Sequence, residues 1–220
     1  SYTGGRVLNA YRNIILYAQW GSLTEGVDLG LSVKWASVNI GANKPEEYGD
    51  YFAWGETETK SHYGYSTYKW LQGKYYTLTK YNTDYDFGNT IDNKIVLDKE
   101  DDAAVANWGG NWRMPTEAEQ YELRDTNNCT WEWTTQNGVN GYKVTSKVNG
   151  NSIFLPADGI FVEILEDKGT CGNYWSSTPQ GDNSCVAYGL NFYFYSEDKN
   201  GIYLLDYERN KRLSVRLVQN

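Results

Sequence analysis

Alternation of apolar and polar residues dominates the C-terminal half of the chain. Successive side chains of a β-strand point to opposite faces of a sheet, so a period of two residues indicates half-buried strands. The runs with this period are Thr130 to Thr135, Gly141 to Val148, Ser152 to Leu155, Val186 to Tyr195, Gly201 to Tyr207 and Leu213 to Val218. Asn149-Gly150-Asn151 separates the second run from the third, and this turn sequence predicts a hairpin.

The clearest helix signal comes before most of these runs. Thr116 and Glu119 form a Thr-x-x-Glu capping box directly after Pro115. In such a box the threonine and glutamate side chains satisfy the first backbone N–H groups of a helix. The sequence therefore predicts a helix that starts here and runs to about Asp125.

Two shorter helices are predicted further towards the N-terminus. Pro45, followed by two glutamates, indicates a short helix through about Gly55, because proline suits the first helical turn and acidic side chains suit the helix dipole there. Asp98 is expected to cap a brief helix through Ala104. A few helices followed by many strands predict an α+β fold rather than repeated βαβ units.

The pattern also divides the chain into two parts. Asn9 to Trp20 alternates like a strand, and its ending LYAQW resembles the last strand of bacterial surface repeats of the internalin B-repeat type. We therefore predict that residues 1–22 are the remnant of a preceding surface repeat or a linker. Residues 23–220 are predicted to form the main domain, within which the polar, tyrosine-rich segment 56–97 is expected to be an ordered insertion.

Composition and charge exclude several classes of partner. The 220 residues include nine Trp and twenty Tyr, so aromatic rings must supply much of the core. The formal net charge is −8, and an acidic surface repels phosphate backbones, which argues against a nucleic-acid partner. There is no apolar run of about 18 residues, so we expect no direct insertion into a membrane.

No group of residues in the sequence marks a catalytic or metal centre. His62 is the single histidine and no Cys-x-x-Cys pair is present, so the zinc and catalytic-triad patterns are missing. Cys171 and Cys185 are candidates for a disulfide across a loop; the alternative is three free thiols, with Cys129 as the third. We expect no cofactor, no metal and no enzyme activity.

A candidate binding surface lies on the last strands. Tyrosine offers a large contact area at little cost in side-chain entropy, and asparagine offers adaptable hydrogen bonds, a composition typical of recognition surfaces. Alternation along the longest run predicts a core face of Val186, Tyr188, Leu190, Phe192 and Phe194. The predicted ligand-binding residues, on the opposite face, the next strand and the flanking turns, are Asn183, Gly189, Asn191, Tyr193, Tyr195, Tyr203, Leu205, Tyr207, Arg209 and Asn210.

Several motifs together resemble one family. They are VDLGLSVKWASVNIGA from Val27, EEYGDYFAWGET from Glu46, NWGGNWRMPTEAE from Asn107, the segment Thr130 to Gly159, YWSST from Tyr174 and LSVRLV from Leu213. From about residue 26 to 218 the chain resembles the major paralogous (FISUMP-type) domains of secreted bacterial surface proteins. That resemblance implies a C-type-lectin-like fold, in which the first and last strands pair and two helices flank twisted antiparallel sheets, and an extracellular or cell-surface location.

The same resemblance includes the variable proteins of diversity-generating retroelements, in which exposed side chains of the last strands change while the fold holds. It implies a non-enzymatic recognition domain that binds a protein or glycan ligand on another cell or host surface. Two alternatives stay open. One is a structural or tip module of an envelope or pilus assembly without a ligand of its own. The other is an enzyme similar to the formylglycine-generating oxidases, which use a cysteine pair.

Overall fold

Strands form most of the structure. The computed structural model describes residues 25–161, 165–195 and 198–220; the strand predicted from Asn9 to Trp20 and the rest of the predicted surface repeat lie outside these residues. In all, 37% of the chain is strand and 11% is helix, with two α-helices in the described part. The predicted α+β fold with two helices flanking the sheets is therefore wrong, and the chain is a mainly β protein.

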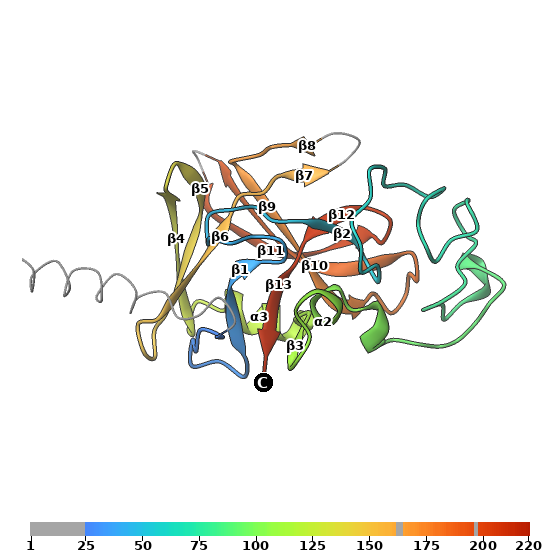
Figure 1. The fold of residues 1–220 in the computed structure, drawn as a ribbon, viewed down its shortest axis with the longest axis horizontal. Helices are drawn as coiled ribbons and strands as arrows, with labels where there is room; N and C mark the ends of the chain where they lie inside the picture. Colours follow the sequence, from blue (N-terminus) through green and yellow to red (C-terminus); the bar gives the residue numbers. More distant parts are fainter. Residues whose placement is uncertain (1–24, 162–164, 196–197) are drawn as a thin grey trace, which may run out of the picture.

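The described residues form four sheets (Figure 1). The largest has the strand order β11-β10-β9-β12-β2 and consists of β2 (Tyr51–Ala53), β9 (Cys171–Pro179), β10 (Val186–Tyr195), β11 (Asp198–Glu208) and β12 (Arg212–Ser214). A three-stranded sheet in the order β1-β13-β3 consists of β1 (Lys34–Asn39), β13 (Arg216–Gln219) and β3 (Trp112–Arg113). The two others contain β4 (Cys129–Gln136), β5 (Val139–Ser146) and β6 (Ser152–Pro156), and β7 (Ile160–Phe161) with β8 (Leu165–Glu166).

The strands predicted from alternation are confirmed, with one change at the C-terminus. The hairpin predicted around Gly150 is the β5–β6 pair. The last run is not one strand but two, since β12 pairs with β2 whereas β13 pairs with β1. The chain thus leaves one sheet and enters another at Val215, and the first and last strands of the described residues lie side by side.

The capping box is also confirmed. Helix α3 (Glu117–Arg124) begins after Thr116, whose hydroxyl accepts a hydrogen bond from the backbone N–H of Glu119, 3.2 Å away. The Glu119 carboxylate accepts in return from the backbone N–H of Thr116 at 2.8 Å. Arg113 forms a salt bridge with the same glutamate at 2.6 Å, which joins the start of α3 to β3.

Of the two other predicted helices, the one after Pro45 is wrong and the one after Asp98 is confirmed only in part. The residues after Pro45 form turns that lead into β2, because Tyr51–Ala53 pairs with Arg212–Ser214 and this distant partner overrides the local signal. Asp98 begins only a short 3₁₀ helix, η2 (Lys99–Asp101). The adjacent helix α2 (Ala103–Trp108) starts instead after Asp102, whose carboxylate accepts from the Ala104 backbone N–H at 2.8 Å.

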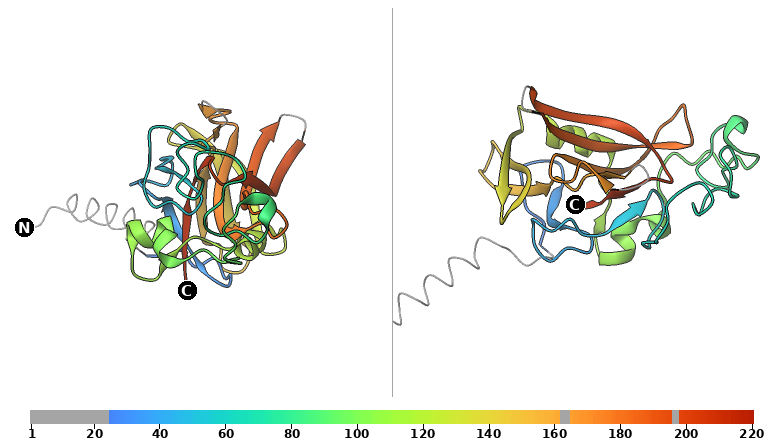
Figure 2. Two further views of the ribbon diagram at one scale, coloured as in Figure 1. Left: turned by 90° about the vertical axis from the view of Figure 1, so that its right-hand side faces the viewer. Right: turned by 90° about the horizontal axis from the view of Figure 1, so that it is seen from above.

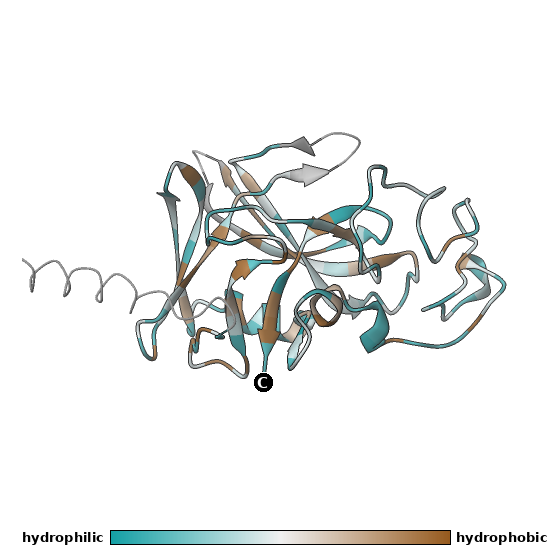
Figure 3. Ribbon diagram, in the orientation of Figure 1, coloured by the Kyte–Doolittle hydropathy of each residue, from teal (hydrophilic) through white to brown (hydrophobic). Residues whose placement is uncertain are grey.

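Aromatic side chains fill the core, and two of the buried indoles donate hydrogen bonds to backbone carbonyls inside it. The buried indole of Trp175 donates to the Phe52 carbonyl at 2.8 Å, and that of Trp54 donates to the Ser176 carbonyl at 2.9 Å. Figure 3 shows hydrophobic segments where β1 and β13 meet the five-stranded sheet, and a mostly hydrophilic insertion. That insertion, residues 56–97, contains η1 (Tyr85–Phe87) and a small apolar cluster around Tyr68 and Leu78.

A buried arginine joins three strands. Arg216 of β13 is 1% exposed and donates to the Asn39 side chain, to the Ala36 carbonyl of β1 and to the Phe154 carbonyl of β6, at 2.8, 3.1 and 2.9 Å. Burial lowers the pKa of its guanidinium to about 10. The side chain therefore holds two sheets together at a cost in desolvation that these three acceptors offset.

We expect Thr116→Ala to lower the free energy of unfolding by about 1 kcal/mol, the usual loss when a capping side chain is removed. Urea denaturation monitored by circular dichroism measures the change. Thr59→Ala is the matched control, because Thr59 is exposed, and it should be neutral. Equal stability of the two variants would contradict the capping role of Thr116.

Candidate recognition surface

Strands β9, β10 and β11 carry most of the predicted binding residues. In this part of the sheet Asn191 lies opposite Tyr203 of β11 and Asn173 of β9. Tyr193 in turn lies opposite Gly201 of β11 and Cys171 of β9. The odd-numbered positions therefore share one face, termed here the recognition face. This face brings together six of the ten predicted residues: Gly189, Asn191, Tyr193, Tyr203, Leu205 and Tyr207.

The solvent-exposed part of the recognition face lies on the outer strand β11. Tyr203 is 37% exposed and Leu205 is 42% exposed. The half-buried ring of Tyr193 stacks on Tyr203, with ring centroids 5.5 Å apart and an angle of 14° between the planes. The two hydroxyl groups are 3.2 Å apart. A paired aromatic surface with an adjacent leucine results.

Glycines opposite the tyrosines make this arrangement possible. A Cβ atom at Gly201 would lie 2.7 Å from the Tyr193 ring, closer than van der Waals contact allows. At Gly189 a Cβ atom would lie 2.9 Å from the Tyr174 carbonyl oxygen and 3.3 Å from the Tyr207 ring. Both tyrosine rings therefore lie across the backbone of a neighbouring strand. The sequence contains the signal, a glycine in each strand run, but only the register shows what each glycine faces.

A buried polar network lies on the same face as the tyrosines, further from the edge of the sheet. The Asn173 side-chain oxygen accepts from the Asn191 amide at 2.9 Å and from the Tyr207 hydroxyl at 2.6 Å. The Asn173 amide donates to the Gly159 carbonyl at 2.8 Å. Asn173 is 1% exposed and Asn191 is 5% exposed. The prediction that Asn191 is available to a ligand is therefore wrong; it supports the surface from within, and so does the buried Gly189.

The predicted residues of the flanking turns do not reach the surface as a group. Arg209 is 1% exposed, donates to the Val186 and Tyr81 carbonyls at 3.1 and 2.9 Å, and lies 4.5 Å over the Trp54 ring. Burial lowers the pKa of its guanidinium. These contacts are possible because β11 ends at Glu208, so the alternation no longer holds at the next residue.

Asn210 and Asn183 are also separate from the recognition face. Asn210 is 5% exposed and therefore cannot serve as a contact residue. The side chain of Asn183 accepts from the backbone N–H of Cys185 at 2.9 Å and so stabilises the turn before β10. The Tyr195 side chain lies outside the described residues, although its backbone pairs with Asp198.

The predicted core face of β10 is mostly correct. Val186, Leu190 and Phe192 are buried, whereas Tyr188 and Phe194 are half-buried. The Phe194 ring stacks on Trp133 of β4, with ring centroids 4.9 Å apart. This face therefore packs on the sheet that contains β4.

Asp158 is a buried carboxyl group that the sequence did not indicate as part of the site. It is fully buried, and one of its oxygens accepts from the Asn173 backbone N–H at 2.9 Å. The other oxygen has no hydrogen-bond partner among the described residues. Burial raises the pKa of this carboxyl to about 8. At neutral pH Asp158 is therefore mainly protonated, and the network around Asn173 remains uncharged there.

The cysteines do not form the pair that was considered. All three are free and buried. Cys171 lies opposite Tyr193 and Cys185 precedes Val186, so roughly 25 Å of strand separates them, far beyond the reach of a disulfide. Burial raises the pKa of the Cys171 thiol to about 11, which keeps it protonated and weakly nucleophilic at neutral pH. The oxidase-like alternative has no cysteine pair as support.

Other kinds of site find no support in the described part of the chain. No three His, Cys, Asp or Glu side chains within it are grouped so as to hold a metal ion. None of its helices has the length and apolar character that a membrane crossing needs. Comparison of the chain with protein-family models, with curated proteins and with solved structures found no match.

Asp158 predicts a pH dependence of stability. The folded chain keeps this proton up to about pH 8, whereas the unfolded chain releases it near the ordinary value of 3.8. As the pH rises between these two values, the unfolded state binds fewer protons than the folded state, so the free energy of unfolding falls. Each pH unit within this window is worth up to about 1.4 kcal/mol.

Asp158→Asn removes this titration and leaves a neutral side chain of similar size. We expect the variant to lose less stability than the parent chain between pH 5 and pH 8, by up to a few kcal/mol, in urea denaturation at both pH values. Other groups titrate in both proteins, so the difference between the two losses isolates Asp158. An equal loss in the two proteins would show that the carboxyl is already ionised at pH 5.

Proposed function

We propose that the chain is a non-enzymatic recognition domain of a secreted bacterial surface protein, which binds a protein or glycan ligand through the exposed part of the recognition face. One observation carries the proposal: the stacked pair of Tyr193 and Tyr203 lies beside the exposed Leu205 and next to a network of buried hydrogen bonds. Tyrosine is enriched at protein interfaces, and an aromatic ring can also stack on the apolar face of a sugar.

The contacts that hold the tyrosine side chains in place favour binding with little loss of conformational entropy. Tyr207 is fixed by its hydrogen bond to Asn173, and the Tyr193 ring lies over the Gly201 backbone. A surface whose side chains already occupy defined positions loses fewer rotamers on binding than a flexible one. This argument favours a specific ligand over a purely structural module.

A protein ligand fits the surface better than a small molecule. Aromatic and aliphatic side chains stand together on it, and none of its six residues lines the hollow beside Trp131 or the hollow beside Phe154. The net charge of −8 favours a partner with basic residues around an apolar centre.

The resemblance to FISUMP-type domains supports a location outside the cell. In the retroelement-diversified members that the chain resembles, the last strands keep a fixed frame while exposed side chains vary. Tyr203 and Leu205 are well placed for such variation, because replacing them leaves the network around Asn173 intact. Asn191 and Arg209 are poorly placed for it, because their side chains are buried in hydrogen bonds.

Tyr203→Ala and Leu205→Ala should each weaken ligand binding at least tenfold, a loss of about 1.4 kcal/mol. The ligand is sought by screening the chain against a glycan array and a display library of surface proteins, and affinities are then measured by surface plasmon resonance. Tyr85→Ala is the matched control: this tyrosine is 75% exposed but belongs to the insertion, and its loss should leave binding unchanged.

Circular dichroism of each variant separates a lost contact from a lost fold. A ligand that binds both recognition-face variants as tightly as the parent chain would show that another surface binds it. Failure to find any ligand in either screen would favour the structural-module alternative.

A further inference from the structure

The outer strand of the largest sheet has a free edge. Strand β11 ends the order β11-β10-β9-β12-β2, and no described strand pairs with its outer side. It is eleven residues long, and Figure 2 shows the β10–β11 pair at the margin of the molecule in both views. A long exposed edge presents unpaired backbone groups that can pair with another strand.

The hydrogen-bond register shows which backbone groups point outward. Arg209 N–H donates to the Cys185 carbonyl, and Phe194 N–H donates to the Thr170 carbonyl. Antiparallel strands exchange bonds at every second residue, so the odd-numbered residues of β11 bond to β10. The backbone N–H and C=O groups of Ile202, Leu204 and Asp206 then point away from the sheet, where no described residue meets them.

The side chains in the middle of this edge strand are not of the types that usually protect an exposed edge. The central stretch of the strand, Gly201 to Tyr207, reads GIYLLDY and contains no proline, no lysine and a single charge, Asp206; the other charges of β11, at Asp198, Lys199 and Glu208, lie at its two ends. Natural proteins protect exposed edges with such residues. Here the exposed Tyr203 and Leu205 stand on one side of the edge instead.

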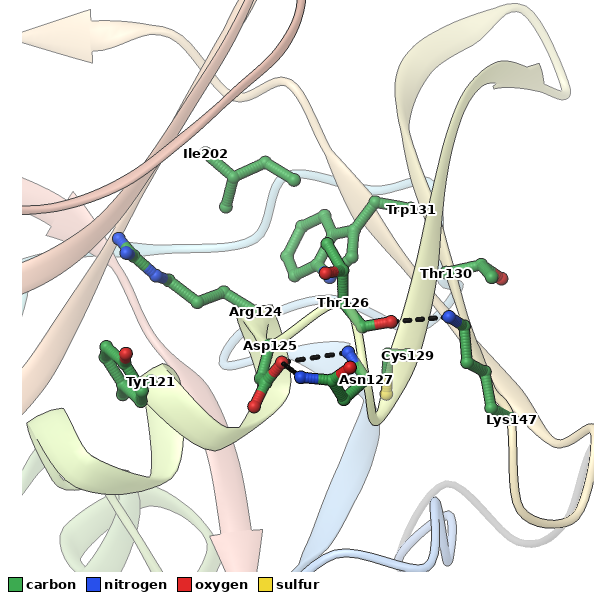
Figure 4. Close-up of a pocket in the computed structure, with 10 residues that line it drawn as sticks. All are labelled: Tyr121, Arg124, Asp125, Thr126, Asn127, Cys129, Thr130, Trp131, Lys147 and Ile202. Carbon is green, nitrogen blue, oxygen red and sulfur yellow. Dashed lines mark hydrogen bonds between the residues drawn. The ribbon is translucent and has the colours of Figure 1, made fainter.

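The other side of the edge borders a hollow of about 590 Å³. Figure 4 shows Ile202 above Trp131, with the Arg124 side chain extending from the end of α3 towards the five-stranded sheet. The Arg124 guanidinium lies 5.1 Å over the Tyr121 ring. No carboxylate of the described residues forms a salt bridge with Arg124.

We propose that a second copy of this chain pairs with β11, antiparallel, around a two-fold axis at Leu204. With this register Tyr203 of one copy lies opposite Leu205 of the other, and Ile202 lies opposite Asp206. Cross-strand neighbours are about 5 Å apart. The exposed aromatic and aliphatic side chains of the two copies therefore lie side by side on one face of the joined sheet, in pairs that occur twice by symmetry.

Charge complementarity identifies the occupant as a second copy. Asp206 of the second copy enters the hollow beside Ile202, which is the hollow that Arg124 lines. Asp206 of the second copy thus meets Arg124, which forms no salt bridge with any described residue of its own copy. The strand of another protein could also pair with the backbone groups of β11. Only a second copy, through the two-fold symmetry, brings one Asp206 carboxylate to the Arg124 side chain at each end of the interface.

The dimer would also extend the recognition face. Leu205 of the second copy stands next to Tyr203, so the two tyrosine pairs become parts of one continuous surface. The pairing itself needs no ligand, and it is therefore tested independently of the proposed function.

Sedimentation velocity of the full 220-residue chain, without ligand, tests the pairing. We expect a dimer at micromolar concentration. Leu204→Pro removes an outward N–H group, which a sheet edge tolerates, and should give a monomer. Because the half-buried Leu204 side chain packs against the core, Leu204→Ala is the control for the lost side chain, and it should still form the dimer. Arg124→Glu and Asp206→Arg should each raise the dimer dissociation constant at least tenfold, and the double variant Arg124→Glu with Asp206→Arg should restore it. Lys74→Glu changes charge by the same amount as Arg124→Glu at an exposed position in the insertion and should leave the dimer unchanged.

Two results would overturn the proposal. The first is a parent chain that is still monomeric at 100 micromolar, about a hundred times the expected dimer dissociation constant. The second is a dimer that Leu204→Pro leaves intact and whose dissociation constant is the same in the double charge-reversal variant as in the single variants. Either result leaves the ligand-binding test with Tyr203→Ala and Leu205→Ala unaffected.

Discussion

The Asn173 side chain is the contact on which the recognition face depends. It belongs to β9, yet its oxygen accepts hydrogen bonds from Asn191 of β10 and Tyr207 of β11, and its amide donates to the carbonyl of Gly159. One buried amide thus fixes three strands and the segment that precedes β7. Inside a protein an unsatisfied polar group costs far more than at the surface, so such a network tolerates few other geometries. The tyrosines of the recognition face therefore have, as neighbours, a hydrogen-bond network with little freedom to move.

The same region separates residues that support the surface from residues that are free to contact a partner. Asn191 and Arg209 are of residue types that are common in binding surfaces, but both donate hydrogen bonds to buried acceptors. Tyr203 and Leu205 make up the exposed part. Such a surface can change its outward side chains with little effect on stability, because the buried hydrogen bonds do not involve them. Under the proposed function, recognition and stability depend on different residues of the same strands.

Local signals in the sequence were sufficient for much of the fold. The capping box of Thr116 and the turn at Gly150 act within a few residues, and both elements form where they were predicted. The helix predicted after Pro45 does not form, because Tyr51–Ala53 pairs with residues about 160 positions later and no local pattern reveals that partner.

The candidate site was predictable to a similar extent. Alternation placed Tyr193, Tyr203 and Leu205 on one face, but it did not show which end of that face is covered. Asn191 is buried next to Asn173, which lies opposite it on β9. A period of two residues along β10 carries no information about this neighbour. Asp158 was missed for the same reason, since its burial is a property of the assembled fold.

The pairing of β13 with β1 has a consequence for the way in which the chain acquires its structure. Arg216 and its neighbours close the gap between two sheets, and their partners near Asn39 lie 177 positions earlier in the chain. Contacts of such sequence separation require a large loop to close before they contribute any stability, and they make folding slow. During synthesis β1 therefore remains without its partner strand, and its apolar side chains remain uncovered, until β13 has left the ribosome.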